Sequence, residues 1–284
     1  MDFNVLALRK LIRDCLNEDI GAGDLTTNSI VPAGAVSNGY IVAKEKGMLA
    51  GMPVAEEIFR CLDPALLFQA RAVDGEFVER GRVLAEVGGN ARAILTGERL
   101  ALNFLQRLSG IATKTAQLVE LVAGQKAHVI DTRKTTPGLR MLEKYAVRVG
   151  GGYNHRFGLY DAVLIKDNHI KAAGGIAKAV QAARRASPHT AKIEVEVESM
   201  AQVGEALEVK ADIIMLDNMA VEMMREAVAL VAGRALVEAS GNVTGENIRA
   251  IAAAGVDLIS VGALTHSVES LDISLDLAEI KADY

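Results

Sequence analysis

Residues 131–170 read D-T-R-K-T-T-P-G-L-R-M-L-E-K-Y-A-V-R-V-G-G-G-Y-N-H-R-F-G-L-Y-D-A-V-L-I-K-D-N-H-I, and the rest of this 284-residue chain can be understood from this stretch. Its first cations, Arg133 and Lys134, follow one short apolar run, and Lys166 follows a second. In parallel α/β folds the loops after the strands carry the ligand. Arg binds carboxylates and phosphates through two hydrogen bonds, and Lys attracts them as a point charge. The stretch therefore predicts an anion-binding site at the ends of two strands.

More cations lie between these two runs. His155 and Arg156 follow three glycines, and Arg140, Lys144 and Arg148 lie on a predicted helix. Any one of them could be an ordinary solvated charge beside a turn, and that interpretation stays open for each taken alone. Their place after predicted strands favours a socket for carboxylates or phosphates.

Composition narrows the class of protein. A net charge of -5 and a pI near 5.6 provide no general basic field, which argues against a nucleic-acid or anionic-membrane partner. Cys15 and Cys61 give no disulfide framework or metal cluster, so we expect a cytoplasmic location. No apolar run is long enough to cross a bilayer. The apolar positions between Leu6 and Leu16 instead predict an amphipathic helix.

Residues 1–110 are expected to form an α+β domain. Strand-like segments separated by Gly, Pro and charged turns lie at 39–43, 66–73 and 83–87, with a helix expected at 54–61. Residues 74–91 resemble the half-barrel of biotinyl and lipoyl carrier domains, but no modifiable Lys lies at the matching hairpin. We therefore expect a barrel-sandwich-like segment with a structural role.

A helical periodicity extends over residues 93–124. Ser109 and Gly110 are expected to break it into two helices, and the domain boundary is placed at residue 110. Arg99 and Arg107 lie on this stretch, and composition alone favours side chains that simply reach water.

From residue 128 onward, short apolar runs alternate with amphipathic stretches, which predicts parallel strands joined by helical crossovers. The runs are 128–130, 162–165, 193–197, 213–216, 235–237 and 258–261. Nearly every run ends on a polar group, and these ends meet on one side of such a sheet.

Two carboxylates, Glu196 and Asp217, close two of these runs. A half-exposed edge strand would show the same alternation around Glu196, and that alternative stays open. In a strand buried on both faces, however, the carboxylates need partners. Paired carboxylates without a Cys or His cluster suit Mg2+ that keeps some water and binds a phosphate substrate.

Two small-residue segments also follow predicted strands: Ser240, Gly241 and Asn242, and Val261, Gly262 and Ala263. Backbone N–H groups in such segments, near helix starts, favour phosphate. Thr244 is the expected N-cap of the helix after the first segment. Small residues also occur there for plain turn geometry.

Three strings, D-T-R-K-T-x-P-G-L-R, K-Y-A-V-x-x-G-G-G-x-N-H-R and L-I-K-D-N-H, resemble nicotinate-nucleotide pyrophosphorylase, or quinolinate phosphoribosyltransferase, a type II phosphoribosyltransferase family. The strings are long and irregular, and the resemblance runs from Asn17 to the end. It implies an α/β fold: an incomplete, about seven-stranded parallel barrel at 111–270 after the α+β domain. It further implies a C-terminal helix at 271–284 that packs back on the N-terminal domain.

The implied reaction converts quinolinate and phosphoribosyl pyrophosphate to nicotinate mononucleotide, pyrophosphate and carbon dioxide, with Mg2+, in NAD biosynthesis. The implied quinolinate site contains Arg133, Lys134, His155, Arg156 and Lys166, with Arg99 supplied across the interface of a homodimer. The implied phosphoribosyl pyrophosphate site contains Thr132, Lys134, Glu196, Asp217, Ser240, Gly241, Asn242, Val261, Gly262, Ala263 and His266. Catalytic roles fall to Lys134, Lys166, Glu196 and Asp217, and the two acids would hold Mg2+ directly or through water.

Three alternatives stay open from the sequence. A related phosphoribosyltransferase acting on another acid would share the same Mg2+ and phosphate contacts. A Schiff-base aldolase-type barrel could use Lys166, although this chemistry needs a neutral amine and a site for dianions favours the charged form. A non-enzymatic anion-binding protein is the third, but pure binding would not need Glu196 and Asp217.

Overall fold

The computed structural model describes residues 4–278, which pack as two compact units. Within the described residues, the first unit contains 4–114, 136–150 and 267–278, and the second contains 115–135 and 151–266. The chain thus passes between the units several times, whereas the sequence suggested single boundaries at residues 110 and 270. The helix at 140–149 belongs to the first unit, where Arg107 holds its buried Glu143 through an ion pair of 2.6 Å.

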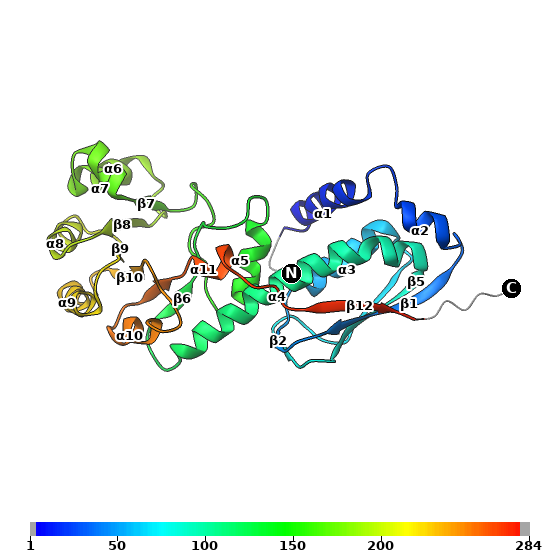
Figure 1. Ribbon diagram of the computed structural model, residues 1–284. Coiled ribbons are helices and arrows are strands. Elements are labelled where there is room, and N and C mark those ends of the chain that lie inside the picture. Colours follow the sequence, from blue (N-terminus) through cyan, green and yellow to red (C-terminus); the bar gives the residue numbers. More distant parts are fainter. Residues whose placement is uncertain (1–3, 279–284) are drawn as a thin grey trace. The chain divides into compact units, whose positions relative to one another are not determined.

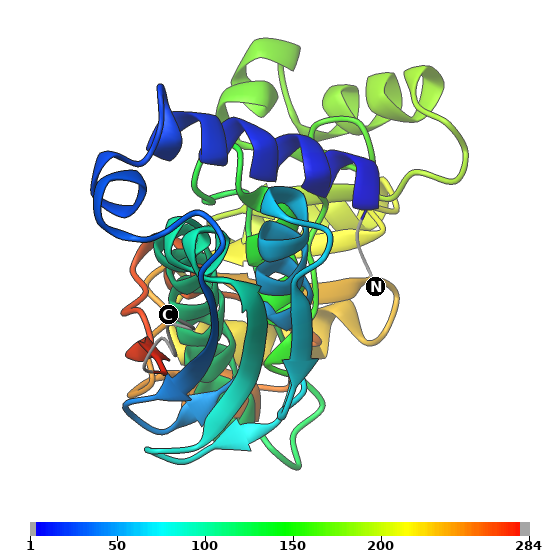
Figure 2. The same cartoon turned by 90° about the vertical axis from the view of Figure 1, so that its right-hand side faces the viewer.

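The first unit is built on an antiparallel sheet with the strand order β12-β1-β5-β3. These strands are Ile273–Leu277, Val36–Ala43, Val83–Asn90 and Leu67–Ala70, and a separate pair joins β2 (Gly47–Met48) to β4 (Phe77–Val78). The strands expected at 39–43 and 83–87 are confirmed as parts of β1 and β5. Figure 2 shows this sheet face-on, with helices behind it. Gly39 of β1 lies against Ile94, so this face of the sheet packs on the long helix that follows β5.

The helix expected at 271–284 is wrong over the described residues. Ile273–Leu277 forms strand β12 and pairs antiparallel with β1. Ile273 and Leu275 are buried and Asp276 is exposed, which is the two-residue period of a strand. Residues 279–284 of the expected helix lie outside the described residues.

The helices of the first unit are α1 (Val5–Ile20), α2 (Leu25–Ile30), α3 (Met52–Leu62), the first part of α4 (Ala91–Leu121) and α5 (Arg140–Val149). The amphipathic N-terminal helix is confirmed: α1 buries Leu8, Ile12 and Leu16, and Asn4 caps it by accepting from two backbone N–H groups. The helix expected at 54–61 is confirmed within α3.

Helix α4 is continuous, so the break expected at Ser109 and Gly110 is wrong. Both residues serve close packing instead. The Ser109 hydroxyl donates to the carbonyl oxygen of Ala50 and accepts from its N–H. A Cβ on Gly110 would lie 2.1 Å from the carbonyl oxygen of Glu269. Because only glycine admits that passing chain, the glycine is a packing feature rather than a helix terminator.

The second unit is a parallel sheet with the strand order β6-β11-β10-β9-β8-β7. Its strands in chain order are β6 (His128–Ile130), β7 (Val163–Ile165), β8 (Ile193–Val197), β9 (Ile213–Asp217), β10 (Leu236–Ser240) and β11 (Leu258–Ser260). All six strands expected from residue 128 onward are therefore confirmed. An isolated parallel bridge between Ile130 and Tyr153 adds one short contact beside β6.

Helices connect these strands: α6 (Asp167–Ala173), α7 (Ile176–Ala186), α8 (Met200–Glu208), α9 (Val221–Val231), α10 (Ile248–Ala253) and α11 (Ala263–His266). Figure 1 shows α7 to α10 in a row along one side of the sheet. Each of α7 to α9 has an apolar face, for example Val203 and Ala206 of α8, that covers the strands. Asn247 stands at the N-cap position of α10, without a side-chain capping hydrogen bond. The expectation that Thr244 is the N-cap is therefore wrong.

Parallel pairing aligns the polar residues of the central strands. Glu196 of β8 and Glu238 of β10 both lie opposite Met215 of β9, and Ser240 lies opposite Asp217. This register places the polar side chains together at the carboxyl ends of the strands.

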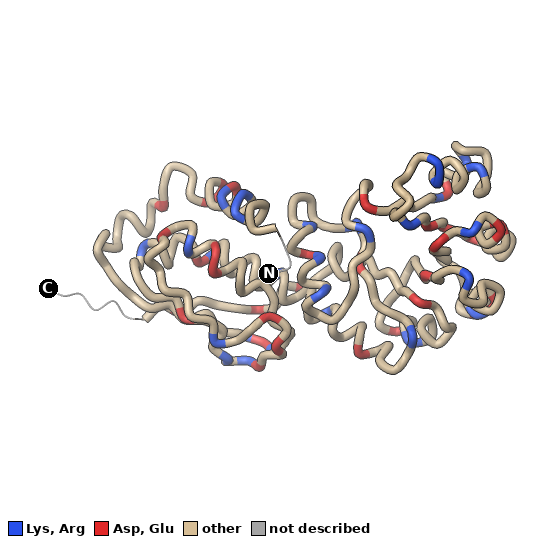
Figure 3. The backbone as a smooth tube through the Cα atoms, turned by 180° about the vertical axis from the view of Figure 1, so that it is seen from behind, with Lys and Arg blue, Asp and Glu red and all other residues tan. Residues whose placement is uncertain are grey.

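Charge is mixed along the chain, with Lys and Arg interspersed among Asp and Glu (Figure 3). Among the described residues, no helix is long and apolar enough to cross a membrane.

Candidate active site

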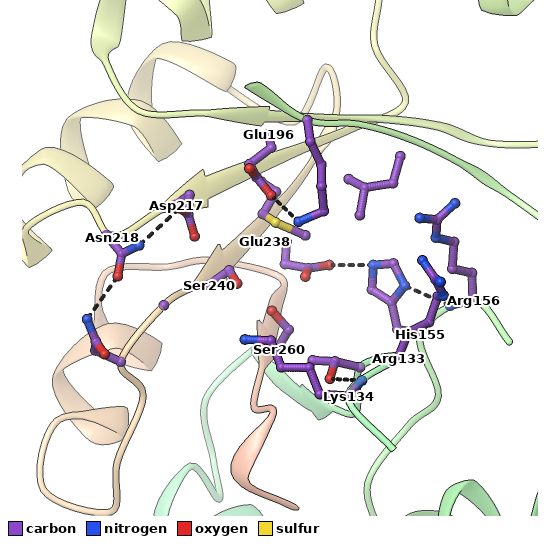
Figure 4. A pocket seen from close by; sticks show the side chains of 16 residues that line it. Arg133, Lys134, His155, Arg156, Glu196, Asp217, Asn218, Glu238, Ser240 and Ser260 are labelled. Atoms are coloured by element: carbon purple, nitrogen blue, oxygen red, sulfur yellow. Dashed lines mark hydrogen bonds and ion pairs between the residues drawn. The ribbon is translucent and has the colours of Figure 1, made fainter. Parts of the chain in front are cut away.

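A cavity of about 620 Å³ opens at the carboxyl ends of the parallel strands. Its lining residues all belong to the second unit: Thr132, Arg133, Lys134, His155, Arg156, Leu164, Lys166, Glu196, Met215, Asp217, Asn218, Glu238, Ser240, Gly241, Asn242 and Ser260. Figure 4 shows Arg133, His155 and Arg156 on one side and Asp217, Asn218 and Ser240 on the other. The cavity is large enough for a small polyanion and has two chemically distinct ends.

Most of the residues predicted for the site line this cavity. Those that do are Thr132, Arg133, Lys134, His155, Arg156, Lys166, Glu196, Asp217, Ser240, Gly241 and Asn242. The predicted residues outside the lining are Arg99, Val261, Gly262, Ala263 and His266. Arg99 is exposed on α4 in the first unit.

Gly262 lies directly behind the lining. A Cβ at this position would come within 3.0 Å of Lys134 Cδ and 3.1 Å of His266 Cδ2. The carbonyl oxygen of Lys134 accepts a hydrogen bond of 2.8 Å from Thr265, and its N–H donates to the Thr132 hydroxyl. The loop that carries Lys134 is thus fixed from both sides.

Lys166 and Glu196 form an ion pair at the carboxyl ends of the neighbouring strands β7 and β8. Lys166 Nζ lies 2.8 Å from Glu196 Oε2, and the lysine side chain is about half exposed while the glutamate side chain is 10% exposed. The Lys166 amine is thus engaged by a carboxylate in this structure rather than free to act as a nucleophile.

Asp131 fixes the segment that carries His155. Its buried carboxylate accepts from the His155 backbone N–H at 2.9 Å and from the Asn154 side chain at 2.6 Å. The Asp131 N–H donates to the carbonyl oxygen of Tyr153. This explains how residues far from β6 in sequence reach the cavity beside it.

The imidazole of His155 has protein partners at both ring nitrogens. Nδ1 accepts the backbone N–H of Arg156 at 2.8 Å, and Nε2 lies 2.9 Å from Glu194 Oε2. Nε2 also lies 3.7 Å from Glu238 Oε2, a contact visible in Figure 4. A ring hydrogen bond to a substrate carboxylate, as the resemblance implied, would have to replace one of these contacts.

Arg156 presents a guanidinium that is only partly satisfied. One terminal nitrogen donates to the carbonyl oxygen of Ala162 at 3.0 Å, whereas the buried Nε has no partner among the described residues. Burial lowers the pKa of Arg156, and the nearby charge of Arg133 lowers it further. Two such cations held together are a strong site for an anion.

Asp217 is oriented by a chain of amides. Asn218 donates to Asp217 Oδ2 at 3.0 Å, and Asn242 donates to Asn218 Oδ1 at 3.0 Å. Gly241, which precedes Asn242, has a φ of 95°, and a Cβ on it would lie 2.2 Å from Asn218 Oδ1. Only glycine leaves room for this network.

Glu196 and Asp217 offer oxygen ligands from adjacent strands. Hard carboxylate oxygens in a wide polar cavity fit Mg2+, which keeps several waters and shares substrate phosphates. The residues present are therefore chemically suited to this ion.

Sequence reasoning missed several lining residues: Leu164, Met215, Asn218, Glu238 and Ser260. Asn218 and Glu238 stand in the same strand-end runs as the predicted residues, so their position was an available signal. Leu164 and Met215 are apolar residues within strands, and no sequence feature distinguishes them from ordinary core residues.

A parallel α/β sheet whose strand ends surround one cavity with cations and carboxylates defines an α/β protein with a site for anionic small molecules. Residues 24–109 match the family model for the N-terminal domain of quinolinate phosphoribosyl transferase, and residues 111–276 match the model for its C-terminal domain. The chain belongs to the quinolinate phosphoribosyltransferase family.

Similar proteins have names that agree with this family assignment. A protein of Bacillus subtilis (strain 168), named probable nicotinate-nucleotide pyrophosphorylase [carboxylating], is 49% identical over 96% of this chain and 94% of its own. A Nicotiana tabacum protein, named quinolinate phosphoribosyltransferase [decarboxylating] 2a, mitochondrial, is 44% identical over 95% of this chain and 82% of its own. The crystal structure of NadC from Streptococcus pyogenes superposes with a TM-score of 0.94 at 44% identity, covering 98% of this chain and 100% of that one.

Proposed function

We propose that this protein is a decarboxylating quinolinate phosphoribosyltransferase. It transfers the phosphoribosyl group of phosphoribosyl pyrophosphate to the nitrogen of quinolinate and releases nicotinate mononucleotide, pyrophosphate and carbon dioxide, a step of NAD biosynthesis. The observation that carries the proposal is the cavity itself: cations on one side and carboxylates on the other, in a member of this family.

The cationic side fits quinolinate. Arg133, Arg156 and Lys166 present three positive groups to one cavity, and quinolinate carries two neighbouring carboxylates. The Arg156 Nε has no partner in the described part of the chain, which supports this role, because a buried donor of this kind needs an acceptor. Arg99 is proposed to complete the site from the partner subunit of a homodimer, which its exposure supports.

The carboxylate side fits the ribose and the diphosphate. Departure of pyrophosphate leaves positive charge on the ribose, which Glu196 and Asp217 stabilise in the transition state. Ser240, Gly241 and Asn242, with Gly262 and His266 behind Lys134, are the proposed phosphate contacts. Lys134 lies between the two groups and is proposed to contact both substrates.

Glu196 and Asp217 are the residues proposed to hold Mg2+. When bound, Mg2+ supplies charge stabilisation for the departing diphosphate. No protein nucleophile is required, because the ribosylated pyridine nitrogen is a cation and stabilises the electron pair left on the ring carbon when the adjacent carboxylate departs as carbon dioxide. That carbon then takes up a proton from water to give the product. The cytoplasm is the proposed location, which the two free cysteines support.

The test is an assay with quinolinate and phosphoribosyl pyrophosphate in Mg2+ buffer, with and without a chelator. We expect nicotinate mononucleotide only when free Mg2+ is present, with activity restored by adding the ion back. Product formation that is unchanged by the chelator would contradict the Mg2+ role. Absence of product with every cation tested would contradict the reaction.

A further inference from the structure

Beneath the cationic side of the cavity lies a buried cluster that substrate binding does not explain. It consists of His155, Glu194 and Glu238, whose side chains are 11%, 4% and 0% exposed. Each of the three offers a ligating atom within 4.8 Å of the others. Two acids buried under a site for a dianion need a reason, because their negative charge opposes that ligand.

The hydrogen bonds within the cluster indicate which of its side chains carry protons. Nδ1 of His155 accepts from the Arg156 N–H, so Nε2 of a neutral ring carries hydrogen and donates to Glu194. If both acids were ionised, Glu194 Oε1 and both oxygens of Glu238 would be buried without a hydrogen-bond donor among residues 4–278. Such unsatisfied groups are rare in proteins. One retained proton joins two of these three oxygens in a hydrogen bond between the acids, and it belongs on Glu238, since Glu194 already accepts from the ring.

Electrostatics leads to the same assignment. Complete burial raises the pKa of Glu238 well above its usual range, and the charge of Glu194 and a hydrogen bond with it raise it further. The Ser260 hydroxyl and Lys166 act in the opposite direction but do not outweigh these effects. A neutral Glu238 removes one of the two negative charges that this pair of acids could carry.

We propose that Glu238 is a positioning residue for quinolinate binding: as a neutral acid it hydrogen-bonds Glu194, which holds His155, which in turn holds the backbone of Arg156. The chain of contacts aims the Arg156 guanidinium at the cavity without adding a second negative charge beneath it. This inference rests on the proposed function for its substrate, but its hydrogen-bonding part stands on the cluster alone.

Two substitutions separate the hydrogen bond from the charge. Glu238→Leu keeps the volume and removes both, whereas Glu238→Gln keeps a donor without any charge. The matched control is Glu222→Gln, the same chemical change at a side chain that is 78% exposed on α9. The measurement is the steady-state KM for each substrate, after the parent protein has been shown to turn over quinolinate.

Glu238→Leu is expected to raise the KM for quinolinate by roughly tenfold or more and to leave the KM for phosphoribosyl pyrophosphate within about twofold, because a buried hydrogen bond to a charged group is lost on the quinolinate side only. Glu238→Gln is expected to restore most of this loss. If Gln is as damaging as Leu, Glu238 acts as an anion, as a metal ligand would, and the proposal is overturned. An equal rise in both KM values would also overturn it.

A second measurement does not depend on the reaction. The charged or titratable groups that face Glu238 are Glu194 from β8, His155 from the segment after α5, and Lys166 after β7; Met215 of β9 and Ser260 of β11 do not titrate. A group whose folded pKa is raised loses its stabilising contribution as pH rises from its unfolded pKa through its folded pKa.

The stability advantage of Glu238→Gln over the parent protein should therefore grow between pH 5 and pH 9 in urea denaturation. An advantage that is constant with pH would show that Glu238 holds no proton in the fold, and would overturn the proposal. An inactive parent would refute the proposed function instead, and this stability comparison would still decide the state of Glu238.

Discussion

Arg156 offers an incoming anion a guanidinium whose buried Nε–H has no partner among the described residues. Its neighbour on the same side of the cavity is Arg133, and the opposite side carries Asp217 (Figure 4). At the scale of single residues, Arg156 and Arg133 are thus expected to bind the acid, and Asp217 is expected to act at the ribose. Substitutions should therefore affect quinolinate binding and turnover separately.

Replacement of Arg156 by Ala is expected to weaken quinolinate binding by about 2 to 3 kcal/mol, or roughly 30- to 150-fold, because charged hydrogen bonds to a desolvated carboxylate are lost. Equilibrium dialysis with labelled quinolinate measures the effect. Arg225→Ala, an exposed arginine on α9, is the control and should bind like the parent. Unchanged binding in Arg156→Ala would place the acid elsewhere.

Asp217→Asn is expected to act on turnover instead. The amide keeps an acceptor for Asn218 but removes the charge that stabilises the ribose cation, so kcat should fall by about 100-fold or more. The dissociation constant of quinolinate should change little. A variant that turns over normally but binds quinolinate poorly would reverse the roles assigned to Asp217 and Arg156.

The cationic residues of the site could be predicted because they stand directly after apolar runs, as Arg133 and Lys166 do. The contacts that orient them could not. His155 and Asn218 owe their geometry to partners distant in sequence, Glu194 and Asn242, and no local pattern reports such pairs.

At the scale of elements, the continuous helix α4 depends on Gly110. An Ala in a helix interior is favoured over Gly by about 1 kcal/mol. Overpacking costs about 1–3 kcal/mol, and here the obstacle is a backbone carbonyl at 2.1 Å, which cannot turn away. Gly110→Ala should therefore destabilise the protein by about 2 kcal/mol in urea denaturation.

Gly204 of α8 is the matched control, since a Cβ there would meet no atom within 4 Å. Gly204→Ala should leave stability unchanged or raise it by up to about 1 kcal/mol. If Gly110→Ala were also stabilising, the close approach of residues 269–270 to α4 would be incorrect.

The parallel strands were predictable because short apolar runs alternating with helices have few other solutions. β12 and the unbroken α4 were not. In β12 the alternation of Ile273 and Leu275 is only one short repeat, and its pairing with β1 joins opposite ends of the chain. For Gly110, helix propensity and tertiary packing predict different outcomes, and packing decides.

At the scale of the whole molecule, the proposed homodimer predicts that Arg99 acts in the site of the partner subunit, and this can be tested. If Arg99 acts in the partner's site, mixing Arg99→Ala with Arg156→Ala creates mixed dimers with one intact site. Random exchange should then recover about a quarter of the parental activity from two proteins that are each much less active alone at low quinolinate. No recovery after confirmed subunit exchange would assign Arg99 to its own subunit or to no site.

The most direct test of the central claim is a paired assay with phosphoribosyl pyrophosphate and Mg2+, in which quinolinate and nicotinate are offered separately and mononucleotide and carbon dioxide are both measured. A site with cations for two carboxylates should give product from quinolinate only, with one carbon dioxide for each mononucleotide. Product from nicotinate at a comparable rate, or none from quinolinate, would contradict the account.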